Sequence, residues 1–197
     1  MENESQRDRL ERCQREVEEH PERASARYNL GLAYTVSGRV KQAEESYLKA
    51  LEIDPTMVQA WVNLGGVRLM RWEFQGCLEA NQAAAKLHDG LPIVHYNMGQ
   101  AYLYLNDPKN LIRCNEKVIE LDRRNGAAHY YAAVGHLAVN NVGAAERHLG
   151  RALELGHQPT QDFIKAMEKA QLKKQHAQPL SLIEISGAET PDNTKED

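Results

Sequence analysis

The residues best suited to chemistry in this sequence are its histidines and cysteines, which can bind metal ions or act as nucleophiles. His129 and His136, two of the eight histidines, are seven positions apart. In a helix they would share one face but lie two turns apart, about 10 Å, which is too far for both to bind one ion. His148 and His157 have no evident partner. We therefore expect the histidines to occupy packing positions, with no metal site.

The cysteines point away from both disulfides and catalysis. Cys13, Cys77 and Cys114 are odd in number, widely spaced and form no CxxC pair. This usage is typical of a reducing compartment, so we expect a cytoplasmic protein. Each cysteine is expected to be a small buried side chain. No glycine-rich phosphate loop or paired carboxylate motif is present, so the sequence predicts a protein that is not an enzyme and binds no cofactor.

Charge and hydropathy exclude two further classes of partner. The formal net charge is −4, with 26% charged and 42% hydrophobic residues, as in ordinary soluble globular proteins. This balance gives no general attraction to nucleic acid. No apolar run reaches the roughly 18 residues of a membrane helix, and the charged N-terminus is unlike a signal peptide. We expect a protein or peptide partner, no nucleic acid and no membrane insertion.

A short segment recurs along the chain every 34 residues. "YNLGLAY" begins at Tyr28, and related segments begin at Val62, Tyr96 and Tyr130. Within each period, apolar residues recur at helical spacing, and breaks such as "SGR" and "IDP" divide the period in two. Each period therefore predicts a helix, a tight turn, a second helix and another turn.

This pattern resembles the tetratricopeptide repeat (TPR) family. The residues that carry the resemblance are "YNLGLAY" with Ala43, Tyr47, Ala50 and Pro55, then Trp61 with "NLG", then "YNMGQAY". The resemblance covers residues 22–157 and implies an all-α fold, a right-handed superhelix of antiparallel helix pairs. The four repeats are expected at about 24–57, 58–91, 92–125 and 126–158. Small residues such as Gly31, Gly65 and Gly99 would let the paired helices approach closely.

Segments with different patterns flank the repeats. Residues 1–21 predict a charged N-terminal helix that covers the first repeat. Residues 159–176 predict a C-terminal capping helix, with Thr160 as its N-cap. Residues 177–197 predict a flexible tail that contains an apolar island, "PLSLIEI", at 179–185. This island is expected to dock on the repeats of its own chain or of a second copy, to extend the packing of the capping helix, or to serve an unrelated partner.

The first helix of each repeat has a second face, which the family resemblance implies is the lining of a concave groove. This face is almost uncharged and is rich in tyrosine, amide and aliphatic side chains, a composition that suits a peptide ligand. The residues expected to contact the peptide are Tyr28, Asn29, Leu32, Val62, Asn63, Met70, Tyr96, Asn97, Gln100, Tyr104, Tyr130 and Tyr131.

Three of these residues, Asn29, Asn63 and Asn97, recur one period apart. Similar asparagine ladders in the family hold the main chain of extended peptides, although asparagine is also common at this repeat position in family members that have no such ligand. The lysine and arginine clamp that binds acidic C-terminal tails in some members is missing. The resemblance therefore implies a protein-binding adaptor or scaffold. The alternatives are a structural or assembly subunit that packs a folded partner through other surfaces, and an accessory or metal-carrying subunit of an enzyme complex.

Overall fold

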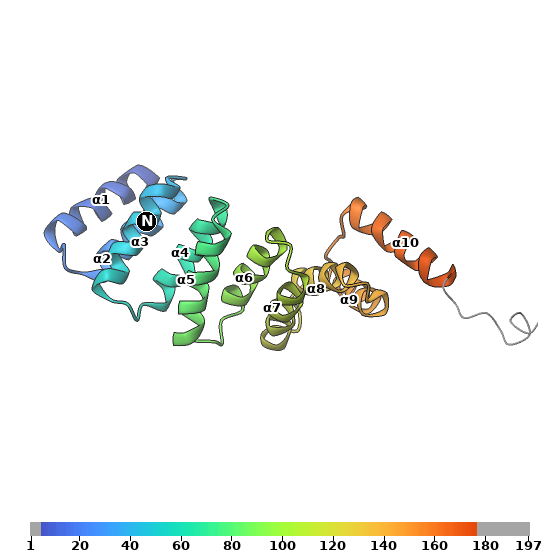
Figure 1. Ribbon diagram of the computed structural model, residues 1–197. Helices are drawn as coiled ribbons and strands as arrows, with labels where there is room; N and C mark the ends of the chain where they lie inside the picture. The colour runs from blue at the N-terminus through green and yellow to red at the C-terminus, as the bar shows by residue number, and fades with distance from the viewer. Residues whose placement is uncertain (1–4, 177–197) are drawn as a thin grey trace, which may run out of the picture. The chain divides into compact units, whose positions relative to one another are not determined.

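The computed structural model describes residues 5–176, and side-chain environments as far as residue 172. Within this range, helices joined by turns and short loops make up the chain (Figure 1). The helices are α1 (Gln6–Glu19), α2 (Ala24–Val36), α3 (Val40–Ile53), α4 (Val58–Met70), α5 (Phe74–Leu87), α6 (Pro92–Tyr104), α7 (Pro108–Leu121), α8 (Gly126–Ala138), α9 (Val142–Glu154) and α10 (Gln161–His176). The prediction of an all-α fold with two helices per period is confirmed.

Helices α1 to α9 belong to one compact unit, and α10 belongs to another. In the first unit α2 packs on α3, α4 on α5, α6 on α7 and α8 on α9, and each pair also contacts the next pair. Helix α4 also touches α6, and α6 touches α8. This packing of neighbour on neighbour is that of an α-solenoid. We call the surface lined by α2, α4, α6 and α8 the first-helix face, and the surface lined by α3, α5, α7 and α9 the second-helix face.

The turn inside each helix pair has the same backbone conformation in all four repeats. Gly38, Trp72, Asn106 and Asn140 are 34 residues apart, and their φ angles are all positive, between 55° and 69°. Such a left-handed residue ends the first helix and reverses the chain. Glycine and asparagine adopt this conformation readily, whereas for a tryptophan it costs about 1–2 kcal/mol. Trp72 is therefore a strained exception in the second repeat.

Glycines bring the two helices of a pair into close contact, as the sequence predicted. A Cβ atom on Gly31 would lie 2.6 Å from the Tyr47 ring. One on Gly65 would lie 2.0 Å from Nδ2 of Asn81. Both partner side chains are fully buried. At these two positions a residue larger than glycine would collide with the buried side chain of the second helix.

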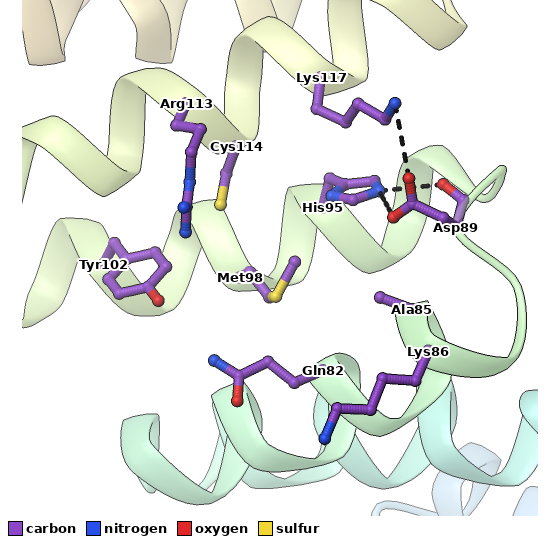
Figure 2. A pocket seen from close by; sticks show the side chains of 10 residues that line it. All are labelled: Gln82, Ala85, Lys86, Asp89, His95, Met98, Tyr102, Arg113, Cys114 and Lys117. Carbon is purple, nitrogen blue, oxygen red and sulfur yellow. Dashed lines mark hydrogen bonds and ion pairs between the residues drawn. The ribbon is translucent and has the colours of Figure 1, made fainter.

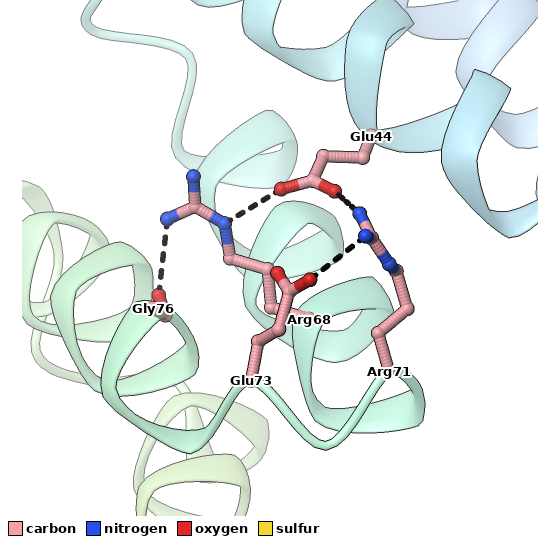
Figure 3. A network of polar contacts seen from close by, with 5 residues as sticks. All are labelled: Glu44, Arg68, Arg71, Glu73 and Gly76. Atoms are coloured by element: carbon pink, nitrogen blue, oxygen red, sulfur yellow. Dashed lines mark hydrogen bonds and ion pairs between the residues drawn. The ribbon is translucent and has the colours of Figure 1, made fainter.

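Arg68 stands where the family pattern has a tyrosine, and a polar network holds its guanidinium (Figure 3). Its Nε donates to Glu44 at 2.9 Å, and its Nη1 donates to the Gly76 carbonyl at 3.2 Å. Arg71 pairs with the same Glu44 and, at 2.8 Å, with Glu73. The Glu44 side chain is only 11% exposed. The charges of α3, α4 and the turn after α4 are thus largely withdrawn from water and depend on one another.

Helix α1 covers the start of the first repeat. The Ser5 side chain caps it by accepting the backbone N–H of Asp8 at 3.2 Å. Its apolar face packs on α2, and this cluster consists of Leu10, Cys13, Val17, Ala26, Leu30 and Ala33. The covering helix expected at 1–21 therefore begins at Gln6 and buries a single apolar stripe.

Helix α10 is capped by Thr160, because its hydroxyl accepts the backbone N–H of Phe163 at 3.3 Å. The expected N-cap is confirmed. The tail predicted at 177–197, with the apolar island at 179–185, lies outside the described residues. Among the helices that are described, none has both the length and the apolar character of a membrane span.

Candidate functional site

The first-helix face carries the residues predicted to bind a peptide, but it exposes them unequally. Met70 is 58% exposed and Tyr104 53%, whereas Asn97 and Tyr130 are both only 7% exposed. The remaining residues are partly exposed, and they are Tyr28, Asn29, Leu32, Val62, Asn63, Tyr96, Gln100 and Tyr131. A ligand on this face would therefore meet mainly the ends of α4 and α6.

The three asparagines do not form the equivalent ladder that their spacing suggests. Asn63 donates through Nδ2 to the hydroxyl of Tyr28 at 3.0 Å. Asn97 is buried and donates through Nδ2 to Oδ1 of Asn81 at 3.3 Å. The physical reason is that Asn81 of α5 supplies an amide partner where the first repeat has Tyr47. Asn97 is thus mostly buried by packing, whereas Asn29 and Asn63 are partly exposed, and a peptide contact of the three amides stays a prediction.

An aromatic cluster lies where α4 and α6 end, and it consists of Trp72, Phe74 and Tyr104. The Phe74 and Tyr104 rings are stacked, with centroids 4.9 Å apart and planes 7° from parallel. Trp72 meets both rings edge-on, at centroid distances of 5.9 Å and 5.1 Å. Its side chain is nevertheless 67% exposed. Exposed apolar clusters of this kind mark contact surfaces more often than chance.

The aromatic cluster lines a pocket of about 230 Å³ between α4, α6 and the turn after α4. Leu69, Met70 and Gln100 complete the walls. The amide nitrogen Nε2 of Gln100 is buried and has no hydrogen-bond partner among the described residues. A buried donor without an acceptor lowers the stability of the folded state by about 1–3 kcal/mol. An acceptor on a ligand that reached this nitrogen would recover that free energy. The pocket combines apolar walls with the side chain of Gln100, whose amide nitrogen is buried and unpaired.

A second pocket, of about 340 Å³, lies on the same face between the beginnings of α6 and α8. Tyr96 forms part of its wall, and its ring meets that of Tyr131 edge-on at 6.2 Å. The other lining residues are Pro92, Ile93, Asn125 and Ala127. The two pockets lie on either side of α6, so a chain that crosses this helix could reach both.

The second-helix face has a pocket of about 400 Å³ that the sequence analysis missed (Figure 2). His95, Met98 and Tyr102 of α6 form its floor, between α5 and α7. Asp89 lies 3.1 Å from His95 and 3.5 Å from Lys117. The walls are Gln82, Ala85, Lys86, Arg113 and Cys114. No motif in the sequence marks this site, because three helices contribute to it and only their packing brings the residues together.

The histidines expected to be isolated meet one another between α8 and α9. Nδ1 of His148 lies 3.2 Å from Nδ1 of His129, and the His148 ring stacks on that of His136 with centroids 5.3 Å apart. The expectation that His148 has no partner is therefore wrong. Burial, and next the neighbouring His136 and His129, lower the pKa of His148 to about 4.

The cysteines show no sign of an activated thiol. Cys13, Cys77 and Cys114 are 2%, 0% and 3% exposed and are not disulfide-bonded. Burial raises the pKa of Cys77 and of Cys114 to about 11. The expectation that all three are small buried side chains is confirmed.

Comparison with known sequences identifies repeats and distant relatives. Residues 24–57 and 93–125 each match a family model described as tetratricopeptide repeat. Human "Protein O-mannosyl-transferase TMTC3" is 27% identical over 153 residues, which cover 68% of this chain and 16% of that protein. "Anaphase-promoting complex subunit cut9" of Schizosaccharomyces pombe is 24% identical over 100 residues, 51% of this chain and 14% of that subunit. The chain thus spans a small part of the length of both relatives.

Solved structures share the fold over most of the chain. MamA from Desulfovibrio magneticus RS-1 has a TM-score of 0.73 at 19% identity, covering 77% of this chain and 86% of that one. YrrB, described as a TPR protein with an unusual peptide-binding site, has a TM-score of 0.75 at 18% identity, covering 85% and 86%. At such identities the likeness establishes the fold alone. Repeats of this kind support a protein-interaction or scaffold role in general, and the 34-residue helix pairs together with the two matched segments show that this chain contains tetratricopeptide repeats.

Proposed function

We propose that this protein is an adaptor that binds an extended peptide segment of a partner protein on its first-helix face, with the aromatic cluster as the anchor. The observation that carries the proposal is Trp72, which is 67% exposed and has a φ of 63°. The equivalent turn residues of the other repeats are glycine or asparagine. A tryptophan here is both strained and exposed to water, and a ligand that covers the indole would recover the free energy of its burial.

The pocket beside Trp72 favours a particular kind of segment. Its apolar walls suit an aliphatic or aromatic side chain, and the unpaired Nε2 of Gln100 suits a main-chain carbonyl. An extended peptide rises about 3.3 Å per residue, so a few residues would carry it across α6 to the pocket beside Tyr96. The predicted contact residues carry no formal charge. Affinity should therefore change little between low and high salt, and acidic tails should bind poorly.

The relationship to YrrB supports the class of ligand but not the residues. YrrB is described as having an unusual peptide-binding site, so this fold accommodates peptide ligands in a protein of comparable length. The assignment of the aromatic cluster depends on this chain alone, because Trp72 interrupts its own repeat pattern.

A tryptophan fluorescence experiment tests the proposal directly. The chain has two tryptophans, so Trp61→Phe leaves Trp72 as the single reporter. Peptides selected from a random display library on the wild-type chain should shift the Trp72 emission to shorter wavelength. Trp72→Gly removes the ring and the backbone strain together, so it should fold at least as well. It should bind at least about 30-fold more weakly, as expected for an interface residue worth 2 kcal/mol or more.

Leu153→Ala serves as the matched control, because Leu153 is an exposed apolar residue, 44% exposed, on α9. It should leave peptide affinity unchanged. Peptides that bind Trp72→Gly as tightly as wild type would exclude the aromatic cluster as the anchor.

A second candidate function is that of a structural or assembly subunit. The likeness to cut9, a subunit of the anaphase-promoting complex, and the pocket on the second-helix face favour it. Such a partner would remain bound to Trp72→Gly. It would be lost from a double variant of the pocket wall, Lys86→Glu with Arg113→Glu, and this difference separates the two functions.

A further inference from the structure

Three side chains from three consecutive helices converge between the third and fourth repeats. Glu116 belongs to α7, His136 to α8 and His148 to α9. One carboxylate oxygen and one nitrogen of each imidazole all lie within 4.8 Å of one another. Two imidazoles and a carboxylate form a ligand set typical of Zn²⁺ and of other divalent transition metals.

The spacing is close to that of an assembled site. Bonds of about 2.0–2.2 Å at tetrahedral angles place two ligand atoms about 3.4 Å apart. Nε2 of His136 already lies 3.8 Å from Oε1 of Glu116. The Glu116 side chain is 51% exposed and can close on an ion, whereas that of His136, only 14% exposed, is held by packing. Closure therefore requires movement mainly of the flexible carboxylate.

The hydrogen bonding of His136 is incomplete without a ligand. Its Nε2 is beyond hydrogen-bonding distance of Glu116, and its Nδ1 is buried with no partner among the described residues. Buried polar atoms in native proteins are almost always paired. Nδ1 of His136 is therefore an exception to this rule, and Nε2 has only the 3.8 Å contact with Glu116. His136 therefore has unused capacity to coordinate.

His129 completes the arrangement from two helical turns away from His136 along α8. Its Nδ1 lies 3.2 Å from Nδ1 of His148, which orients the His148 ring and engages one of its nitrogens. Metal-binding histidines commonly have such an outer contact, which fixes ring orientation and tautomer. His129 and His136 are still too far apart in α8 to share an ion, but His148 of α9 contacts both rings.

From this geometry we propose that Glu116, His136 and His148 bind one divalent transition-metal ion, of which Zn²⁺ is the representative, with His129 as a positioning residue. Three protein ligands leave a fourth position for water or for a group from a partner. An ion bound here would connect α7, α8 and α9. Because the site cannot exist in the unfolded chain, binding would stabilise the folded state by RT ln(1 + c/Kd), where c is the free ion concentration, and this gain rises with the logarithm of c once the site is saturated.

The test uses the full chain without a histidine tag. Zn²⁺ is titrated by calorimetry, and Co²⁺ by visible absorption, whose d–d bands report the coordination number. We expect one ion per chain and a melting temperature that rises with Zn²⁺ concentration. His136→Gln, His148→Gln and Glu116→Gln should each weaken binding at least about tenfold. His129→Gln should weaken it less and should also alter the Co²⁺ spectrum, which a purely structural role would not do.

Two matched control variants replace residues outside the group. Glu120→Gln lies on the same helix as Glu116, and His88→Gln replaces an exposed histidine outside the group. Both should bind the ion as wild type does. Circular dichroism shows whether each variant folds, and the exposed Glu116 remains an informative position if a histidine variant does not. The proposal is overturned if wild type binds no more Zn²⁺ than the double variant of His136 and His148, or if Glu116→Gln and Glu120→Gln bind equally.

Discussion

Gly65 and Gly66 are adjacent in α4 but meet different surroundings, and this contrast tests the close packing of the helix pairs. A Cβ atom on Gly65 would lie 2.0 Å from Nδ2 and 2.8 Å from Cγ of Asn81. A Cβ atom on Gly66 would meet nothing within 4 Å. We expect Gly65→Ala to destabilise the fold and Gly66→Ala to stabilise it, although the two substitutions are chemically identical.

The size of the difference follows from the contacts of Asn81. Both variants gain about 1 kcal/mol from the better helix propensity of alanine. In Gly65→Ala, however, the buried Asn81 must shift, which breaks its hydrogen bonds to the Cys77 carbonyl at 2.9 Å and from Asn97 at 3.3 Å. Overpacking costs about 1–3 kcal/mol, and each lost bond about 1 kcal/mol. The net loss expected for Gly65→Ala is therefore about 2–4 kcal/mol.

Urea denaturation followed by far-ultraviolet circular dichroism measures both free energies of unfolding. Asn81→Ala removes the clashing amide, so combining it with Gly65→Ala should cost less than the two single variants together. A coupling of about 1–3 kcal/mol is expected for residues in direct contact. The explanation is refuted if Gly65→Ala unfolds at the wild-type urea concentration, or if it and Gly66→Ala shift the midpoint alike. Gly65→Leu, with its larger side chain, should lower the free energy of unfolding more than Gly65→Ala does.

Two further outcomes are expected from the polar network and the thiols. Glu44→Gln should lower the free energy of unfolding by about 2–3 kcal/mol, somewhat less than the loss of a partner from a fully buried ion pair, because the Arg68 and Arg71 side chains remain 19% and 29% exposed. The control is Glu45→Gln, which replaces an exposed glutamate of the same helix. Equal urea midpoints for the two variants would contradict the network. Cys77 and Cys114 have pKa values raised from 9.0 to about 11 in the folded protein, so they should resist alkylation by iodoacetamide at neutral pH until urea unfolds the chain. Rapid labelling of the folded protein would contradict their burial. Since unfolded thiols ionise first, these two residues should also make the folded state less stable as pH rises from about 9 to 11, and Cys77→Ala should reduce that slope.

The features that sequence predicted correctly are those that depend on local pattern. The 34-residue period specifies helix pairs, because apolar spacing and turn residues are properties of neighbouring positions. The contact between Gly31 and Tyr47 follows from the same pattern, since a small residue must face a large one in every pair. Even the left-handed turn at Trp72 could be predicted, because it lies one period after Gly38.

The features that sequence missed depend on the register between helices. Spacing along α8 correctly separates His129 from His136, yet it contains no information about the side of α9 that faces them. His148 therefore seemed isolated until packing placed it against both rings. The burial of Asn97 was missed for the same reason, because it depends on contact with Asn81, a side chain of a neighbouring helix.

Departures from the repeat pattern fall into two physical classes, and the difference indicates where ligands should be sought. In a solenoid each repeat packs against its neighbours in the same way, so a residue that departs from the repeat pattern is tolerated when neighbouring side chains satisfy its polar groups or fill its space. Arg68 is compensated by Glu44, and Asn81 by Asn97. Trp72 keeps a strained backbone and an exposed ring. Gln100 and His136 each keep a buried nitrogen unpaired within the described residues. Nothing within the described residues compensates these last three, and in the two proposals made above their compensation comes from outside the chain: a peptide at Trp72 and Gln100, and a metal ion at His136.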